Sequence, residues 1–339
     1  MNINRVELGQ RLPLETPFSV HIFPTFYCNF RCSYCLHSLS ADKLEKMNFV
    51  KQKMEFSTFK KAIDDISDFK SKIKALIFAG HGEPLLHPDI AEMIRYASEK
   101  NVAERIEIVT NASLLTNELS DRLIDAGLDR LRVSLQGITS KKYKEISNVD
   151  IDMDELISRL KYFYNKKTKT EVYVKVMDIS LDSQDEFGRF KEMFESVCDI
   201  ASIEYTIPFV NEVDYSQFGD LSHKCKQGNT GKSDICSMPF YMMVVYPDGS
   251  VVPCCSTTVP IKYGNINEKS LVDIWNGKQQ HAFLKKQLSG FKNINICKDC
   301  SVPDFGLQDG DYLDAYKEDL IRKYSDEEYE NDRLYISDK

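Results

Sequence analysis

Residues 21–35 read HIFPTFYCNFRCSYC, and their three cysteines follow the spacing C-x3-C-x2-C directly after a β-favouring run. Thiolates this close together on one loop can bind a metal jointly, because soft sulfur ligands select zinc, copper(I) or iron–sulfur clusters. A structural zinc site normally has four ligands, and the next cysteine, Cys198, lies far along the chain. Three thiolates on a cube of four irons would leave one iron open to a ligand that is not protein. A zinc knuckle or three unrelated core cysteines are the alternatives.

Length and composition set the broad class of the protein. A chain of 339 residues forms one large or two ordinary domains. Its ten cysteines, in a sequence without a recognisable secretory leader, indicate thiol or metal chemistry in a reducing compartment. No apolar run approaches the roughly 18 residues that span a bilayer, so we expect a cytoplasmic protein that binds no membrane. A net charge of -8 argues against a nucleic-acid partner, since such binding relies on basic surface.

The sequence alternates between strand and helix patterns from residue 19 onward. Ser57 and Thr116 are expected to begin two of the intervening helices, and the second of these is expected to stop at Gly127. Repeated strand–helix–strand units need right-handed crossovers and build a parallel sheet. We therefore predict the α/β class, with a partial (β/α)6 TIM-like barrel followed by a small auxiliary cluster-binding domain made of a β-hairpin and a helix. The six predicted strands are 19–27, 75–79, 105–110, 130–135, 172–177 and 200–206.

The β/α rhythm stops near Asn211, and this break sets the predicted domain boundaries. Residues 216–235 are polar and rich in Gly, Ser and Lys, as linkers and loops are. The C-terminal residues are rich in Asp, Glu, Lys and Tyr, which favours a solvated helix or a partly disordered end. The predicted divisions are an N-terminal arm (1–17), the barrel (18–215), the auxiliary domain (216–310) and an acidic tail (311–339).

The predicted strand 130–135 indicates a polar barrel interior. Its residues alternate strictly, with arginine and serine on one face and branched apolar residues on the other. Lys175 falls on the polar face of the next strand in the same way. A closed barrel fills its interior with apolar side chains, so we infer a polar cavity here. A buried hydrogen-bond network that satisfies itself is the alternative.

Glycine and polar residues stand where consecutive predicted strands end. The second strand is followed by GHGEP (80–84), in which two glycines permit close backbone approach and Glu83 offers a carboxylate for an ammonium group. The third strand ends in TN (110–111) and the fourth in SLQG (134–137). The carboxyl ends of barrel strands meet at one face, where such barrels carry out their chemistry. We therefore expect these runs to line one site.

A second group of cysteines occurs near the end of the chain. Cys236 precedes a predicted hairpin at 241–252, whose turn brings Cys254 back towards it, and a C-x2-C pair follows at Cys297 and Cys300. Four thiols in such a two-plus-two arrangement would saturate a metal site. From the spacing alone, zinc and an iron–sulfur cluster both remain open.

The first cysteine motif, with the aromatic Tyr34 before its last cysteine, resembles the signature of the radical S-adenosylmethionine (SAM) superfamily. The runs at 80–84, 110–111 and 134–137 resemble that family's Gly-Gly-Glu-Pro, Thr-Asn-Gly and Ser-Leu-Asp-Gly motifs, although His81 lengthens the first and Gln136 replaces an Asp. The resemblance implies a 4Fe–4S cluster whose open iron chelates SAM and whose electron cleaves SAM to a 5'-deoxyadenosyl radical. The implied cluster ligands are Cys28, Cys32 and Cys35, and the implied SAM contacts are Tyr34, Gly80, Gly82, Glu83, Pro84, Asn111, Ser134 and Gln136.

The second cysteine group resembles the auxiliary-cluster domains called SPASM and twitch, including their Gly-Asn and Ile-Trp-Asn runs, here at 264–265 and 274–276. A full SPASM domain has further cysteines after the position of Cys300, so the resemblance is to the single-cluster twitch form or to a truncated SPASM domain. It implies a second 4Fe–4S cluster. Four thiolates leave no open iron, so we expect electron transfer, with a purely structural cluster as the alternative. The implied ligands are Cys236, Cys254, Cys297 and Cys300.

The chain most resembles the twitch-type dehydrogenase that oxidises a secondary alcohol of an aminocyclitol. The resemblance implies a radical SAM oxidoreductase that acts on a sugar or cyclitol and receives electrons from a flavodoxin- or ferredoxin-type reductant. We expect a base such as Lys175 or Glu107 to accept the hydroxyl proton. Of the remaining cysteines Cys198, Cys225 and Cys255, the last two could instead donate a hydrogen atom to a substrate radical, as an epimerase requires. A peptide-modifying maturase and a non-enzymatic electron carrier are the further alternatives.

Overall fold

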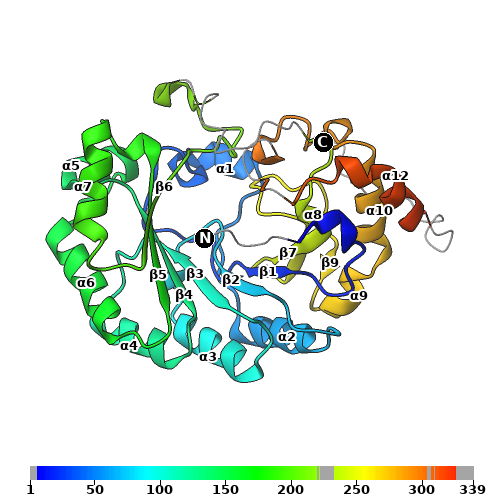
Figure 1. Ribbon diagram of the computed structural model, residues 1–339, viewed down its shortest axis with the longest axis horizontal. Helices are drawn as coiled ribbons and strands as arrows, with labels where there is room; N and C mark the ends of the chain where they lie inside the picture. Colours follow the sequence, from blue (N-terminus) through cyan, green and yellow to red (C-terminus); the bar gives the residue numbers. More distant parts are fainter. Residues whose placement is uncertain (1–5, 220, 222–232, 304–306, 309, 326–339) are drawn as a thin grey trace.

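One mixed sheet organises the molecule. The computed structural model describes residues 6–219, 221, 233–303, 307–308 and 310–325. In this part of the chain the sheet has nine strands in the order β6-β5-β4-β3-β2-β1-β7-β8-β9 (Figure 1). The strands are β1 (Ser19–Ile22), β2 (Ala75–Phe78), β3 (Ile106–Thr110), β4 (Arg130–Leu135), β5 (Glu171–Met177), β6 (Ile200–Glu204), β7 (Met242–Val245), β8 (Ser250–Val252) and β9 (Gly264–Asn265).

The first six strands form the predicted barrel. Strands β1 to β6 are parallel, and each pairs with the next along the chain. The intervening helices cover the outer face of the curved sheet (Figure 1). This confirms the predicted α/β class and partial barrel. The helices are α1 (Ala41–Lys46), α2 (Phe56–Ser67), α3 (Ile90–Lys100), α4 (Asn117–Asp125), α5 (Ser140–Ser147), α6 (Met153–Lys166), α7 (Gln184–Phe194), α8 (Met238–Tyr241), α9 (Leu271–Trp275), α10 (Lys278–Leu288) and α12 (Lys317–Lys323).

Capping residues explain where one of the two predicted helices begins. The Thr116 hydroxyl accepts a hydrogen bond at 3.1 Å from the backbone N–H three residues on, and so caps α4 as predicted. Gly127 follows this helix with a φ of +88°, as a C-terminal glycine does. The prediction for Ser57 is wrong, because Glu55 occupies the N-cap position and Ser57 lies inside α2.

The inner face of β4 and β5 is polar, as the alternation predicts. Residues along both strands alternate between partly exposed and buried. Arg132 Nη1 lies 2.8 Å from Glu107 Oε1, and Arg132 Nη2 lies 3.6 Å from Glu204 Oε1. The alternate apolar side chains of these strands belong to the buried core. The barrel therefore encloses ion pairs where closed barrels hold branched apolar residues.

The hairpin of β7 and β8 extends the barrel sheet. These strands pair antiparallel around Gly249, whose φ of +81° suits the turn, which confirms the predicted hairpin. Strand β7 also pairs in parallel with β1, with Ser19 opposite Met242. The barrel and the C-terminal segment consequently share one sheet and one apolar core. The exact domain boundaries stay a prediction.

The N-terminal arm packs against the C-terminal helix α12. Leu8, Leu12, Leu320 and Tyr324 belong to one buried cluster. A backbone hydrogen bond of 2.8 Å from the Leu8 N–H to the Gly310 carbonyl joins the same two segments. Residues 311–325 of the predicted tail are therefore packed, because their apolar side chains are buried against the arm. The rest of the tail lies outside the described residues.

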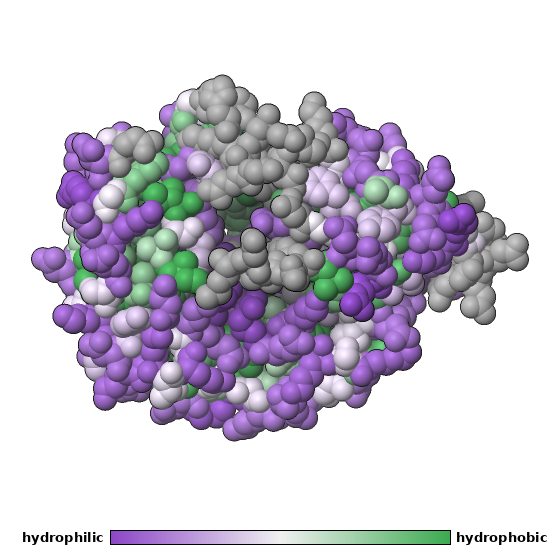
Figure 2. Space-filling model, viewed as in Figure 1, coloured by the Kyte–Doolittle hydropathy of each residue, from purple (hydrophilic) through white to green (hydrophobic). Residues whose placement is uncertain are grey.

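The face of the molecule seen in Figure 2 is mainly hydrophilic and is hollowed between the barrel and the C-terminal segment. Helices such as α2, α3 and α4 bury apolar residues at helical spacing and turn their polar residues outward. Within the described ranges, no helix has the length and apolarity needed to cross a membrane.

Candidate active site

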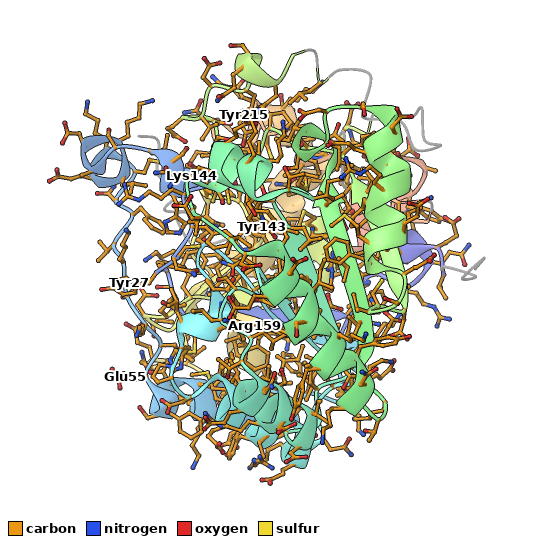
Figure 3. The ribbon with its side chains drawn as sticks, turned by 90° about the vertical axis from the view of Figure 1, so that its left-hand side faces the viewer. Tyr27, Glu55, Tyr143, Lys144, Arg159 and Tyr215 are labelled. Carbon is orange, nitrogen blue, oxygen red and sulfur yellow. The ribbon has the colours of Figure 1, made fainter. Side chains whose placement is uncertain are left out.

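The loop after β1 brings its three cysteines together. Cys28, Cys32 and Cys35 all line one cavity, and burial, followed by the neighbouring Cys35 and Cys28, raises the pKa of Cys32 well above its usual value. Two backbone N–H groups of the loop donate to carbonyls at the end of α5, at 3.0 and 2.7 Å. Beneath the loop, Phe30 packs edge-on against Tyr143 of α5, with ring centroids 6.3 Å apart (Figure 3). These contacts fix the loop on the barrel.

Two glycines let the loop after β2 pack directly against the cysteine loop. A Cβ atom on Gly80 would lie 2.3 Å from the Phe23 ring, and one on Gly82 would lie 2.3 Å from the Thr25 carbonyl oxygen. Gly80 also has a φ of +121°, which other residues rarely adopt. The close backbone approach that the sequence predicts is therefore made to the cysteine loop, and it holds Glu83 beside the three thiols.

The carboxylate of Glu83 is buried and accepts three hydrogen bonds. The donors are the Thr110 hydroxyl at 2.5 Å, the Asn111 N–H at 2.8 Å and the Leu85 N–H at 3.0 Å. Burial raises the pKa of Glu83 to about 6, although these donors oppose the shift. An ionised carboxylate offers about four acceptor positions, so one remains for a cation in the cavity.

A hydrogen-bonded chain orients Tyr34. Its hydroxyl donates to the side-chain oxygen of Gln136, and the Gln136 amide nitrogen donates to the Ser134 carbonyl at 3.0 Å. The Tyr34 carbonyl accepts a bond of 2.9 Å from the Tyr215 hydroxyl (Figure 3). Both ends of the Gln136 amide are thus engaged, and the Tyr34 ring is held at the wall of the site.

Lys175 and Glu204 form an ion pair at the carboxyl ends of β5 and β6, with 2.5 Å between Nζ and Oε2. Burial lowers the pKa of Lys175, and Glu204 only partly offsets this. Burial raises the pKa of Glu204, but Lys175 and Arg132 together bring it below its usual value. This partly buried pair can hold and exchange a proton beside the cavity.

Glu107 lies deeper in the barrel and is linked to this pair through Arg132, which also contacts Glu204. It is 1% exposed, and it is paired with Arg132 at 2.8 Å and with Arg105 at 3.2 Å. Of the two bases that the sequence suggests, only Lys175 lines the cavity. Glu204, which the sequence analysis did not single out, is its partner there. The alternation of Ser202, Glu204 and Thr206 along the predicted strand 200–206 was the signal that could have found it.

These side chains enclose one cavity of about 360 Å³ at the carboxyl ends of the strands. Its wall includes the three cysteines of the first motif, Lys175 and Glu204. Of the implied SAM contacts, Pro84 alone does not line it among the described residues, since it is buried at the start of a short turn behind Glu83. The implied contacts that do line it are Tyr34, Gly80, Gly82, Glu83, Asn111, Ser134 and Gln136.

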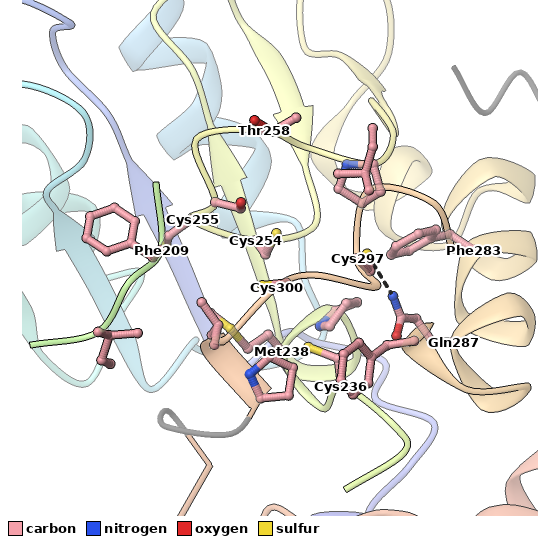
Figure 4. A pocket seen from close by; sticks show the side chains of 18 residues that line it. Phe209, Cys236, Met238, Cys254, Cys255, Thr258, Phe283, Gln287, Cys297 and Cys300 are labelled. Atoms are coloured by element: carbon pink, nitrogen blue, oxygen red, sulfur yellow. Dashed lines mark hydrogen bonds between the residues drawn. The ribbon is translucent and has the colours of Figure 1, made fainter. Parts of the chain in front are cut away.

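The four later cysteines line a second cavity of about 210 Å³ (Figure 4). Burial, and after it the thiolates of Cys236 and Cys297, raises the pKa of Cys254 well above its usual value. The Gln287 amide nitrogen lies 3.8 Å from Cys297 Sγ, and Cys300 lies on the same wall. The fold thus brings together the two-plus-two set that the spacing suggests.

One short segment separates the two cavities. Ile207 and Phe209, directly after β6, line both of them. The Ser301 hydroxyl, next to the C-x2-C pair, donates to the Pro208 carbonyl at 2.6 Å. Asp178 accepts a bond of 2.9 Å from the Thr206 N–H on the barrel side. The partition of Ile207 and Phe209 could not be predicted from the sequence, because apolar residues after a strand form no recognisable motif.

Of the remaining cysteines, the two that the structure describes, Cys198 and Cys255, do not line the first cavity. Cys255 lines the second cavity, and its Sγ lies 3.4 Å from Nδ1 of His21 inside the barrel. Cys198 is buried in the apolar core. Cys225 lies outside the described residues.

The two thiol sets suit iron–sulfur clusters. Such clusters take cysteine thiolates as ligands, with an open iron if only three are supplied. Each set lines a cavity that can hold a group of several atoms, about 360 Å³ for the first set and about 210 Å³ for the second.

Comparisons with known proteins agree with these two sites. The family model of the radical SAM superfamily matches residues 22–188, and that of SPASM, an iron–sulfur cluster-binding domain, matches residues 236–301. The chain is 25% identical over 325 residues to the tungsten-containing aldehyde ferredoxin oxidoreductase cofactor-modifying protein of Pyrococcus furiosus, covering 83% of this chain and 86% of that protein. It is 33% identical over 131 residues to GTP 3',8-cyclase of Chlorobaculum tepidum, covering 39% of this chain and only 36% of the relative.

Solved structures share the fold. BtrN in complex with AdoMet and 2-DOIA matches with a TM-score of 0.54 and 19% identity, covering 84% of this chain and 92% of BtrN. SuiB of Streptococcus suis bound to precursor peptide SuiA matches with a TM-score of 0.61 and 17% identity, covering 88% of this chain and 72% of SuiB. The cofactors of the two matched domains are SAM, a SAM-binding 4Fe–4S cluster and an auxiliary 4Fe–4S cluster. The chain therefore carries a radical SAM domain followed by a C-terminal cluster-binding domain of the SPASM type.

Proposed function

We propose that this radical SAM enzyme oxidises a secondary alcohol of a sugar or aminocyclitol to a ketone. Radical SAM enzymes act on small molecules or peptides. We call the cavity lined by Cys28, Cys32 and Cys35 the SAM-side cavity, and the cavity lined by the four later cysteines the auxiliary cavity. The observation that carries our choice is the partly buried Lys175–Glu204 pair, which lines the SAM-side cavity next to the partition between the two. Charged and polar walls favour a polyhydroxylated substrate, and the shared partition favours the removal of two electrons.

In this proposal each cavity holds one cluster. The Glu83 carboxylate binds the SAM ammonium group, and Tyr34, oriented by Gln136, lies beside the adenine. Gly80, Gly82 and Pro84 shape the loop that carries Glu83, and Asn111 and Ser134 contact SAM from the neighbouring strand ends. The ligands of the SAM-binding cluster are Cys28, Cys32 and Cys35, and those of the auxiliary cluster are Cys236, Cys254, Cys297 and Cys300.

The protein's part in the chemistry is to bind the alcohol and to move its proton. When bound, SAM and its cluster supply the radical that takes the carbinol hydrogen, and the auxiliary cluster supplies an acceptor for the remaining electron. The hydroxyl proton passes to the Lys175–Glu204 pair. These two side chains are already hydrogen-bonded to each other and partly buried. Loss of one hydrogen atom, one proton and one electron leaves a ketone.

Isotope transfer tests this function. Sugars and aminocyclitols deuterated at single carbinol carbons are incubated anaerobically with reconstituted enzyme, SAM and a reductant. We expect deuterium in 5'-deoxyadenosine and one equivalent of a product lighter by two hydrogens, measured by mass spectrometry. Consumption of SAM without any oxidised product across this substrate set would contradict the proposal.

Epimerisation is less well supported than oxidation. It needs a hydrogen-atom donor beside the substrate radical, and Cys255 lines the auxiliary cavity instead of the SAM-side cavity. Cys225, the other donor that the sequence suggests, lies outside the described residues. A product of unchanged mass carrying one solvent deuterium, with loss of turnover in Cys255→Ala, would be the result that favours epimerisation.

SAM binding should weaken in acid because of Glu83. Burial raises the pKa of this carboxyl to about 6, and only its ionised form attracts an ammonium group. Above that pH the carboxylate is present and affinity is full, and below it protonation removes the charge. We expect SAM affinity to fall by about tenfold for each pH unit below about 6. Calorimetry between pH 5 and 8 checks this, with Glu83→Gln as a control that should bind SAM weakly at every pH.

A further inference from the structure

A third cavity of about 900 Å³ lies beside the two cofactor cavities. We call it the His81 groove. It shares no lining residue with the SAM-side cavity, but Thr258 and Ile296 line both the groove and the auxiliary cavity (Figure 4). Its lining residues are Phe26, Lys43, Lys46, Met47, Asn48, Phe49, Val50, Gln52, His81, Glu212, Tyr246, Asp248, Thr257, Thr258, Val259, Lys262 and Ile296.

His81, the residue that lengthens the glycine motif, lines this groove. It is 7% exposed, and its Nε2 has no hydrogen-bond partner among the described residues. Aromatic rings surround it, with centroids of Phe26 at 5.7 Å, Tyr246 at 6.0 Å and Phe49 at 6.3 Å. Burial lowers the pKa of His81 to about 4, so its imidazole is neutral at pH 7. A buried ring nitrogen without a partner costs free energy that a ligand can recover.

Two carboxylates, Glu212 and Asp248, and three lysines also line the groove. Glu212 Oε2 is also buried without a partner among the described residues. Lys43 donates to the Glu212 carbonyl at 3.2 Å, and Lys262 lies 3.8 Å from an oxygen of Asp248. Each ammonium carries three N–H donors, so both keep donors for a ligand. Lys46 adds a third positive charge to the same groove.

We propose that the His81 groove binds a nucleoside phosphate. The partly buried rings of Phe49 and Tyr246 offer a surface on which a planar base can stack. A base edge carries both donors and acceptors, which match the Glu212 carboxylate and the neutral His81 imidazole. The ammonium groups of Lys43, Lys46 and Lys262 supply the charge that a phosphate needs. The site is separate from the SAM-side cavity and does not depend on the alcohol oxidation proposed above.

Calorimetry on the reconstituted holoenzyme tests this proposal. Saturating SAM is present throughout, so that the adenine-binding region of the SAM-side cavity is occupied. We expect GTP or ATP to bind with micromolar affinity that falls as salt is raised. Inorganic triphosphate and the free nucleoside should each bind at least about tenfold more weakly, because each lacks one half of the contacts. No heat from either nucleotide would overturn the proposal, and triphosphate binding as tightly as GTP would reduce the groove to an anion site.

Variants assign the binding to the groove. His81→Phe keeps the ring packing and removes the ring nitrogen, and should weaken nucleotide binding about tenfold. Lys46→Glu combined with Lys262→Glu should weaken it by at least about tenfold through lost attraction. Lys141→Glu combined with Lys70→Glu makes the same charge change at side chains 87% and 72% exposed, away from the groove, and is the matched control. SAM affinity serves as the folding check. Nucleotide binding unchanged in both groove variants would overturn the assignment, as would an acidic, aromatic peptide that binds where nucleotides do not.

Discussion

Replacing Cys236 by alanine is expected to abolish ketone formation while SAM cleavage continues. Cys236 lines the auxiliary cavity, where burial raises its pKa to about 12. The SAM-side thiols lie on a different loop, across the partition of Ile207 and Phe209. Replacing a residue that hydrogen bonds to a metal ligand typically lowers metal affinity or activity by about 10–100-fold. Loss of a ligand itself should cost more, so we expect the ratio of ketone to 5'-deoxyadenosine to fall by at least about 100-fold.

Two matched thiol variants control this prediction. Cys198→Ala removes a buried cysteine of the core, and Cys255→Ala removes the cysteine next to the ligand Cys254. Both should keep the ratio of ketone to 5'-deoxyadenosine near that of the wild type. The measurement is chromatography with mass detection of both products under anaerobic conditions. A Cys236→Ala enzyme that still forms ketone in proportion to SAM cleavage would show that the second cluster is structural.

Replacing Lys175 and Glu204 together by methionine and glutamine is expected to slow alcohol oxidation by about 10²–10⁴-fold, the usual contribution of acid–base catalysis. The double change is preferable to either single one, since removing one partner leaves the other charge buried and unpaired. SAM affinity should be unchanged, because Glu83 and its three donors are untouched.

A second lysine–carboxylate pair provides the control for this variant. Lys169 and Asp129 lie 2.6 Å apart just before β5 and β4, at the ends of these strands opposite the cavity. Lys169→Met with Asp129→Asn should leave turnover within about twofold of the wild type, as surface pairs contribute little. Turnover of the Lys175/Glu204 variant at a similar level would exclude the pair as the proton acceptor.

The barrel could be predicted from the sequence because its signals are local. Strand and helix periodicity placed five of the six strands within two residues of their observed bounds and extended the first, predicted as 19–27, five residues too far; the runs that follow the strands meet around one cavity. The parallel pairing of β7 with β1 joins segments far apart in the chain, and no local pattern reports such a contact. The structure therefore has one nine-stranded sheet, whereas the sequence predicted six barrel strands and a hairpin in a separate domain.

The candidate bases show a second limit of sequence reasoning. Alternation tells which face of a strand a residue occupies, but it does not tell how deep the residue lies along the barrel axis. Glu107 pairs with Arg130 at the start of β4, whereas Lys175 pairs with Ser134 near its end. Four residues along a strand correspond to about 13 Å. That depth separates a structural ion pair from a group that lines the cavity.

Iron and sulfide per chain after anaerobic reconstitution test the central claim most directly. The wild type is compared with a variant in which Cys28, Cys32 and Cys35 are all replaced by alanine. We expect about eight irons in the wild type and about four in the variant, because the auxiliary cavity keeps its four thiols. About four irons in the wild type and none in the variant, with zinc at the second site, would contradict two clusters and remove the electron acceptor from the proposed oxidation.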